Sequence, residues 1–147
     1  MKPLLLSFIL MFVLIRSIAQ SFTINSPDNR ITVSCDIGKA TYSVSYSGQP
    51  VLKESKLGLI RDDQDFTKNL KLVKTSAPVT VKDNYSMLTA KKKNISYTAI
   101  RRVIETKPAS GKKMNIIFQV SNDGIAFRYE FPETSTQVKK INSEETS

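Results

Sequence analysis

The chain has 147 residues with a formal net charge of +9, and it contains 5 glycines, 6 prolines, 1 cysteine and no histidine. This length accommodates one domain, or part of a larger one, but not two. The absence of histidine excludes Ser-His-Asp and Cys-His catalysis within this chain, as well as histidine-ligated zinc, iron or copper sites. A single cysteine cannot form an intramolecular disulfide, so no disulfide framework supports the fold.

The first 19 residues have the pattern of a secretory signal peptide. Lys2 gives the positive start, an apolar run follows, and Ala19 is one of the small residues that a signal peptidase reads. The apolar run is shorter than the ~20 residues that a membrane-spanning helix needs. We therefore predict cleavage after Ala19, a mature domain over residues 20–147, and a periplasmic or secreted bacterial protein without a stable membrane anchor. An uncleaved N-terminal anchor is the alternative.

From residue 21 onward, apolar and polar residues alternate with the period of two that is typical of half-buried β-strands. The clearest example is a pair of alternating segments on either side of Asn122-Asp123-Gly124, which is a hairpin signal. Short strands separated by turns predict an all-β fold, an antiparallel β-sandwich. The expected strands cover residues 21–25, 30–37, 39–46, 51–52, 57–60, 70–74, 79–82, 95–105, 114–120 and 125–131.

The segments between these strands are polar and rich in turn residues. Residues 26–29 and 47–50 are expected to form turns, because they combine proline with asparagine, aspartate or glycine. Residues 61–69 are expected to form a loop. The tail, residues 134–147, is either one further strand or a frayed end. Cys35 is in phase with the apolar residues of its strand, which predicts a buried thiol rather than a reactive one.

The acidic segment Asp62-Asp63-Gln64-Asp65 raises the question of a hard cation, because carboxylates two residues apart can share one Ca²⁺. The segment lacks the glycine and the distal glutamate of an EF-hand loop. We therefore interpret it as a polar surface loop.

Glycoside hydrolysis needs two carboxylates that face each other across the bond to be cleaved. Glu130 lies on a clearly predicted strand, on the same face as Arg128. This arrangement favours an ion pair over an acid catalyst. The other glutamates available are Glu54, Glu105 and Glu133.

Basic residues occur in clusters that could contact phosphates or anionic lipid. The chain has no tryptophan, and no aromatic residues interleave with the lysines in a stacking pattern, so we predict no nucleic-acid partner. Tyr42, Tyr46 and Tyr129 are in phase with apolar neighbours, which predicts core positions rather than platforms for sugar rings. The basic clusters are Lys91-Lys92-Lys93, Arg101-Arg102, Lys112-Lys113 and Lys139-Lys140.

Several segments between residues 22 and 133 carry a family resemblance. They are Ser26-Pro27-Asp28-Asn29, TYSVSY at 41–46 followed by GQPVL at 48–52, SKLGL at 55–59 and, most distinctive, FQVSNDGIAFRYEFP at 118–132. In this order they resemble the N-terminal domain of glycoside hydrolase family 97, the exported α-glycosidases of Bacteroides-type bacteria. The resemblance implies part of a galactose-mutarotase-like β-super-sandwich, which is followed in the family by a catalytic (β/α)₈ barrel and a small β-domain.

In that family, the catalytic carboxylates and most ligands of a Ca²⁺ come from the barrel, and one further carboxylate comes from later in the sandwich. The resemblance therefore assigns no catalytic, cofactor-binding or metal residue to this chain. It implies no cofactor in this fragment, although Ca²⁺ is expected in the full-length enzyme. Mutarotase-like epimerase chemistry is disfavoured, because its known form uses histidine.

The function implied by the resemblance is that of a non-catalytic N-terminal sandwich of an α-glucosidase or α-galactosidase. Its expected partners are the barrel and, through the full-length enzyme, an α-linked oligosaccharide. The alternative is a stand-alone carbohydrate-binding or envelope-binding module. A sandwich stopped part-way leaves strand edges unpaired and one sheet face uncovered. We therefore expect residues 20–147 alone to be marginally stable or to self-associate.

Overall fold

The computed structural model describes residues 20–89, 93–109 and 111–146. The predicted signal peptide, Lys91 and Lys92 lie outside the described residues. The described part contains no helix that is long and apolar enough to cross a membrane. It forms twelve β-strands: β1 Ser21–Asn25, β2 Ile31–Asp36, β3 Thr41–Tyr46, β4 Gln49–Lys56, β5 Leu59–Arg61, β6 Gln64–Asp65, β7 Leu70–Thr75, β8 Val79–Ser86, β9 Asn94–Pro108, β10 Met114–Ser121, β11 Ile125–Glu130 and β12 Ile141–Glu144.

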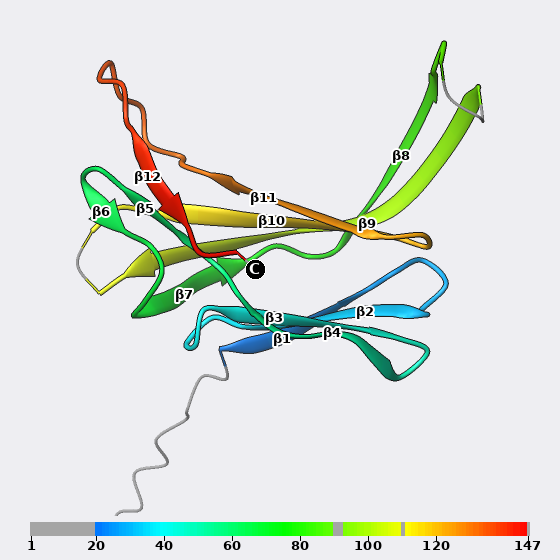
Figure 1. Ribbon diagram of the computed structural model, residues 1–147, viewed down its shortest axis with the longest axis horizontal. Helices are drawn as coiled ribbons and strands as arrows, with labels where there is room; N and C mark the ends of the chain where they lie inside the picture. The colour runs from blue at the N-terminus through cyan, green and yellow to red at the C-terminus, as the bar shows by residue number, and fades with distance from the viewer. Residues whose placement is uncertain (1–19, 90–92, 110, 147) are drawn as a thin grey trace, which may run out of the picture.

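The strands form two large sheets and one small one. Sheet 1 has the order β1-β2-β3-β4; sheet 2 has the order β11-β10-β9-β7, with β8 also paired to β9; sheet 3 has the order β12-β5-β6. The strand pairs in all three sheets are antiparallel. Sheets 1 and 2 are stacked face to face, with sheet 3 at one end (Figure 1). The predicted antiparallel β-sandwich is therefore confirmed.

The core lies between sheets 1 and 2, where the period-two pattern places apolar side chains of both sheets. Phe118 of β10 is fully buried at its centre, with ring centroids 6.0 Å from Tyr42 and 5.3 Å from Phe127. Such tilted aromatic pairs add to the free energy gained from burial alone. Cys35 is 2% exposed on β2, as predicted. The other fully buried core side chains include Val33, Ile104, Met114, Ile116 and Val120.

One hydrogen bond joins the two sheets through their turns. The backbone N–H of Asp28, in the β1–β2 turn, donates to the side-chain oxygen of Asn122 in the β10–β11 turn at 3.1 Å. The β10–β11 hairpin itself closes through a bond from Ser121 N–H to the carbonyl of Gly124 at 2.9 Å. The hairpin signal in the sequence therefore also marks a contact between the sheets.

Strand β9 extends beyond its neighbour β10. The last pair between them joins Ala99 to Ser121, whereas the pairing of β8 with β9 continues out to Ser86 and Asn94. Residues 82–86 and 94–98 therefore form a two-stranded ribbon, here called the arm, which projects from the sandwich (Figure 1). The sequence predicted β8 only as far as residue 82, because the residues beyond it show no apolar alternation.

Two other expectations need correction. Gln49 and Pro50 begin β4 instead of completing a turn; the turn is limited to Ser47 and Gly48, which have φ values of 47° and 80°. Pro50 is tolerated because β4 lies at the edge of sheet 1. The expected loop over residues 61–69 contains the short strand β6. Of the two expectations for the tail, the further strand is confirmed as β12.

Candidate functional site

The acidic segment interacts with protein donors. Asp63 Oδ1 accepts a hydrogen bond from Arg61 Nε at 2.6 Å, and its Oδ2 accepts one from Lys112 Nζ at 2.9 Å. Asp65 accepts from the backbone N–H and the hydroxyl of Thr67, at 2.8 Å and 2.6 Å. These bonds favour a structural role over a cation site. Among the described residues, no group of three or more cysteine, aspartate and glutamate side chains is placed to hold a metal.

The Arg61 side chain is the centre of a buried ionic cluster. It is 3% exposed and lies 2.6 Å from both Asp63 and Glu133. Its guanidinium also stacks over two aromatic rings, 4.4 Å from the centroid of Phe131 and 5.4 Å from that of Phe66. Arginine suits this position because its planar guanidinium can bind carboxylates and stack on rings at the same time.

Two lysines complete this cluster. Lys112 Nζ lies 2.9 Å from Asp63 and 3.5 Å from Glu133, and Lys139 Nζ lies 3.3 Å from Asp63. Hydrogen bonds from Lys112, and then from Arg61, hold the pKa of Asp63 well below its usual range. A carboxylate in this state is a poor general acid or base near neutral pH. The cluster therefore fastens the tail to sheet 3 through Glu133 and Lys139.

The remaining glutamate candidates also lie beside cations. Glu130 is 3.5 Å from Arg128 on the same strand, so the predicted ion pair is confirmed. The other two pairs are Lys113–Glu105 at 2.7 Å and Lys39–Glu54 at 3.9 Å.

Arg101 and Arg102 are adjacent in sequence but lie on opposite faces of β9. Arg102 points toward sheet 1, where it donates to the carbonyl of Thr23 at 3.1 Å and lies 5.3 Å from the ring centroid of Phe22. It also donates to the carbonyl of Ser76 at 3.2 Å. Arg102 therefore has a structural role, whereas Arg101 is exposed on the outer face of sheet 2.

Of the three tyrosines that were predicted to lie in the core, two do so and Tyr46 does not. Tyr42 is 7% exposed in the core, and Tyr129 packs against the core. Tyr46 was predicted to lie in the core but is 42% exposed, with the Arg30 guanidinium 5.7 Å from its ring centroid. It lies at the end of β3, next to the turn, where the alternation continues but the core does not.

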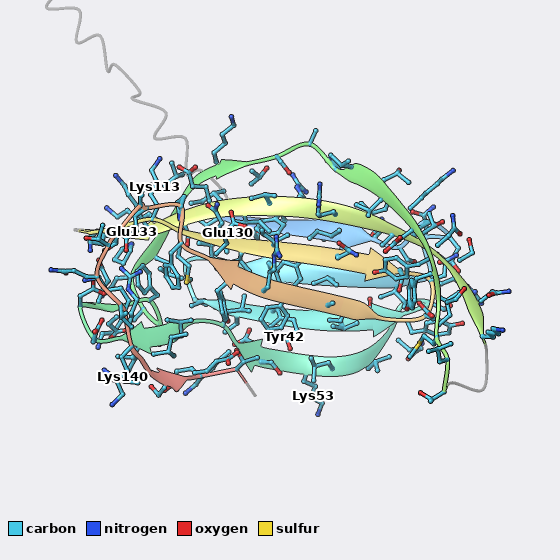
Figure 2. All side chains as sticks on the ribbon, turned by 90° about the horizontal axis from the view of Figure 1, so that it is seen from above. Tyr42, Lys53, Lys113, Glu130, Glu133 and Lys140 are labelled. Carbon is cyan, nitrogen blue, oxygen red and sulfur yellow. The ribbon has the colours of Figure 1, made fainter. Side chains whose placement is uncertain are left out.

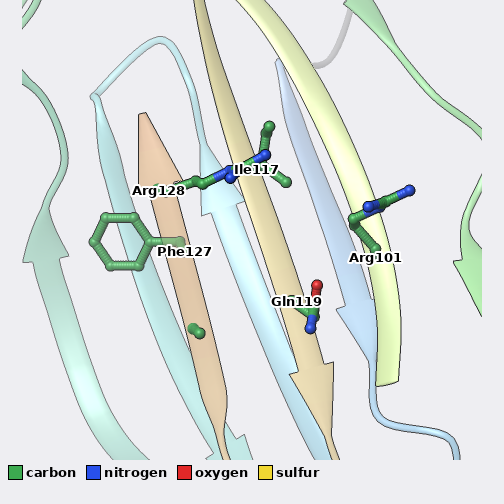
Figure 3. Close-up of a pocket in the computed structure, with 6 residues that line it drawn as sticks. Arg101, Ile117, Gln119, Phe127 and Arg128 are labelled. Atoms are coloured by element: carbon green, nitrogen blue, oxygen red, sulfur yellow. The ribbon is translucent and has the colours of Figure 1, made fainter. Parts of the chain in front are cut away.

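The outer face of sheet 2 carries a shallow pocket of about 240 Å³. The strand register places Arg101 beside Gln119, and Ile117 beside Arg128. Figure 3 shows these side chains on three neighbouring strands, with Arg128 extending toward Ile117. Ile117 is only 7% exposed although it lies outside the core cluster. The outer face of this sheet therefore buries apolar surface of its own.

The arm continues this outer face. Tyr97 lies four residues before Arg101 on β9, so both side chains point to the same face of the strand. Tyr85 of β8 pairs with Ile95, which lies six residues before Arg101, so Tyr85 points to this face as well. The side-chain amide of Gln119 donates to the hydroxyl of Tyr97 at 3.1 Å, which joins the arm to the pocket. Tyr85, nearer the tip, is 46% exposed. The sequence did not identify this surface, because its residues are brought together only by the register of three strands.

The chemistry of the pocket is that of a binding surface. It is lined by hydrogen-bond donors and apolar groups, without a carboxylate or a thiol in its lining: Arg101, Ile117, Gln119, Ala126, Phe127 and Arg128. Guanidinium and amide groups can orient a polar partner, but they do not accept protons at neutral pH.

Comparison with known proteins finds relatives over most of this chain. A relative from Streptomyces bingchenggensis (strain BCW-1), described as a probable retaining alpha-galactosidase, is 27% identical over 114 residues, which are 78% of this chain and 18% of that protein. A solved beta-arabinopyranosidase has a TM-score of 0.79 and 31% identity, over 85% of this chain and 20% of its own. A glycoside hydrolase family 97 enzyme from Pseudoalteromonas sp. strain K8, in complex with panose, shares the fold with a TM-score of 0.72 and 20% identity over the same shares.

The chain thus spans about a fifth of the length of these relatives. The family model of the glycosyl-hydrolase 97 N-terminal domain matches residues 24–147. The chain belongs to the glycosyl-hydrolase 97 N-terminal family.

Proposed function

We propose that this chain is the non-catalytic N-terminal β-sandwich of an exported α-glycosidase, and that it packs against a catalytic (β/α)₈ barrel and shapes its active site. The observation that carries the proposal is the family match over residues 24–147 in a chain that covers only 20% of its solved relatives. The full-length protein is proposed to act on an α-linked oligosaccharide, with Ca²⁺, in the periplasm or outside the cell.

The charges of the described residues support a non-catalytic role. Hydrolysis of a glycosidic bond needs two carboxyl groups facing each other across a cleft. The four glutamates considered above lie instead beside lysine or arginine, as do Asp63 and Asp65. The outer-face pocket has no carboxylate in its lining.

The surface that we assign to the barrel is the outer face of sheet 2 together with the arm. An exposed face of an antiparallel sheet is normally polar, with alternation between a buried and a solvated side. Here Ile117 and Ala99 are buried outside the core cluster, and Tyr85 and Tyr97 extend the apolar surface along the arm. A sheet whose outer face also buries apolar groups, among donors such as Arg101 and Gln119, is suited to be a middle layer, with sheet 1 on one side and a second domain on the other.

The direct test is the DNA that follows codon 147. A reading frame that encodes a barrel, in frame or displaced by a frameshift, supports the proposal, and its absence from the locus contradicts it. The purified chain should release no 4-nitrophenol from 4-nitrophenyl α-glucoside or α-galactoside. Turnover by this chain alone would also overturn the proposal.

The assigned surface can be tested in the full-length enzyme with two matched substitutions. Ala126→Lys places a charge at an exposed position in the outer-face pocket, and Ser34→Lys places one at an exposed position on sheet 1. We expect Ala126→Lys to weaken domain packing, seen as a lower melting temperature of the enzyme and reduced kcat/KM. Ser34→Lys should change neither. Equal effects would contradict the assigned surface.

A stand-alone carbohydrate-binding module is a second candidate function, and the exposed rings of Tyr46 and Tyr85 favour it. Aromatic faces of this kind can pack against sugar rings. Isothermal titration of the chain with maltose and melibiose separates the two functions. Binding that is lost in Tyr85→Ala or Tyr46→Ala supports the module, and the absence of heat supports the domain role. Binding to anionic vesicles that weakens with salt would indicate an envelope-binding module.

A further inference from the structure

The turn between β10 and β11 contains a dipeptide that can rearrange without an enzyme. Asp123-Gly124 is the one place in the chain where glycine follows aspartate. The carboxyl carbon of an aspartate can be attacked by the backbone nitrogen of the next residue. Glycine has no Cβ, so it hinders close approach of other groups to its backbone less than any other residue. The sequence therefore places the least hindered form of this reaction in the β10–β11 turn.

The fold leaves the dipeptide open. Asp123 is exposed, and a Cβ added at Gly124 would meet no atom within 4 Å. The backbone N–H of Gly124 donates to none of the described residues, because the turn is closed by the Ser121 N–H and the Gly124 carbonyl instead. Figure 2 shows the turn at the end of the sandwich opposite to Glu133 and Lys140 of the tail. The attacking nitrogen is therefore neither shielded by the tail nor engaged by a described acceptor.

Ser121 holds the carboxyl group that would react. Its hydroxyl lies 2.5 Å from Asp123 Oδ1 and 3.0 Å from the carbonyl oxygen of Gly124. Attack on a carboxyl carbon places negative charge on its oxygens, and a hydrogen-bond donor stabilises this charge. The hydroxyl is thus placed to favour the attack.

The neighbouring Asn122 is where this turn contacts sheet 1. Its side-chain oxygen accepts the bond from the Asp28 N–H at 3.1 Å. Asp28 is itself fixed, because its carboxylate accepts from the Ser26 hydroxyl and from Arg30 Nε, both at 2.6 Å. A longer β10–β11 turn would therefore move Asn122 away from a partner that cannot follow.

We propose that Asp123 converts to isoaspartate in the folded chain, and that this modification breaks the bond between the turns of the two sheets. The Gly124 nitrogen bonds to the carboxyl carbon of protonated Asp123 and gives up its proton, while the carboxyl hydroxyl leaves. One water is lost, and a succinimide ring forms. A water molecule then opens the ring at the backbone carbonyl of Asp123, so the chain runs on through the side chain and the turn gains one backbone carbon. Water is the only co-reactant. The inference goes beyond the proposed function and does not rest on it.

Incubation of the purified chain in native buffer at pH 5 tests the reaction, because the carboxyl group must be protonated to lose its hydroxyl. Fragmentation mass spectrometry locates isoaspartate, which has the same mass as aspartate. The modification at residue 123 should accumulate at a rate within about tenfold of the rate in urea, because an exposed turn costs almost no free energy to open. Formation in urea without formation in native buffer would overturn the proposal, since the fold would then protect the turn.

Two substitutions isolate the ring closure. Gly124→Ala adds a methyl group beside the attacking nitrogen, and alanine fits this position because Gly124 has no positive φ and has open space around it. Asp123→Glu lengthens the side chain, so that the ring would be larger and would close more slowly. Each variant should form the modified residue several-fold more slowly than the unmodified chain. If one variant does not fold, the other decides, and a rate equal to that of the unmodified chain would overturn the proposal.

Deamidation of Asn122 is the competing source of an altered turn. Loss of ammonia changes the mass of the chain, whereas conversion of Asp123 to isoaspartate does not. Asp123→Asn is the positive control, because it forms the same ring with loss of ammonia and shows the mass change. Isoaspartate that appears in the unmodified chain only together with this mass change would place the reaction at Asn122 and overturn the proposal.

The effect on the sheets is measured on modified chain separated by chromatography. Its Asp28 amide should exchange hydrogen as fast as in Asn122→Ala, and its melting temperature should fall by a similar amount. A protected Val33 amide reports that the sandwich is still folded. An Asp28 amide that exchanges as slowly as in the unmodified chain would overturn the proposed break between the turns.

Discussion

The hydroxyl of Tyr129 accepts a hydrogen bond from the backbone N–H of Gly58 at 2.7 Å, across 71 positions of sequence. This bond joins β11 of sheet 2 to the segment that leads from β4 into β5. Burial raises the pKa of Tyr129, so the phenol keeps its proton, and this proton can be donated to the nearby Thr146 hydroxyl. One side chain thus connects the second sheet, the β4–β5 segment and the tail.

Replacing Tyr129 with phenylalanine should destabilise the domain while preserving its packing. The Gly58 N–H would lose its acceptor, and an unsatisfied part-buried donor costs about 1–3 kcal/mol. Urea unfolding followed by circular dichroism measures the loss. Tyr85→Phe is the matched control, because Tyr85 is 46% exposed on the arm, and it should shift the free energy of unfolding by no more than about 0.5 kcal/mol. Equal losses in the two variants would contradict a structural role for this bond.

Gly58→Ala should destabilise the domain more than Gly48→Ala does. Both glycines have positive φ values, 115° and 80°, so alanine is strained at either position, by about 1–3 kcal/mol. At Gly58, the added Cβ would also collide with the backbone of Phe66 and Thr67, whereas it meets nothing at Gly48. We expect the difference between the two variants to exceed about 1 kcal/mol in urea unfolding, because backbone atoms cannot move aside as a flexible side chain can. Similar midpoints would show that the backbone at Gly58 adapts.

The hairpin of β10 and β11 was the most predictable part of the fold. The alternating segments predicted for residues 114–120 and 125–131 correspond to Met114–Ser121 and Ile125–Glu130. Phe118 and its alternate neighbours are buried as the pattern indicates. This succeeds because both strands face one core, so the hydrophobic period reports directly on the side that each residue faces.

The arm and the Arg61 cluster could not be predicted in the same way. Residues 82–86 of β8 face no core, so their polar sequence contains no period from which a strand could be read. Arg61 was placed in a loop, and its partner Glu133 is distant in the sequence, so only the fold brings the two together. Tyr46 continues an apolar alternation but lies at the end of β3 beside the turn, where it is 42% exposed.

Asp63 should make the domain sensitive to acid. Hydrogen bonds from Lys112, and then from Arg61, hold its pKa well below the ordinary value of 3.8, so the ionised carboxylate stabilises the folded state. This stabilisation is fully present above about pH 4 and is lost as pH falls from there toward the lowered pKa. Urea unfolding of the chain at pH 6 and pH 2.5 should show the loss. Asp63→Asn should be less stable than the unmodified chain at pH 6 and should lose less between the two pH values. An equal loss in both proteins would assign the acid sensitivity to other carboxyl groups.

Cys35 provides a measure of how often the sandwich opens. Burial raises the pKa of its thiol to about 12, from an ordinary value of 9.0, and the thiolate is the reactive form. At pH 8, Ellman's reagent should therefore react far more slowly with the folded chain, in which Cys35 is 2% exposed, than with the chain in urea. Because the reagent reaches Cys35 only when the sheets separate, the slow rate reports this opening. Labelling within seconds in native buffer would show that Cys35 is accessible and that its burial does not persist in solution.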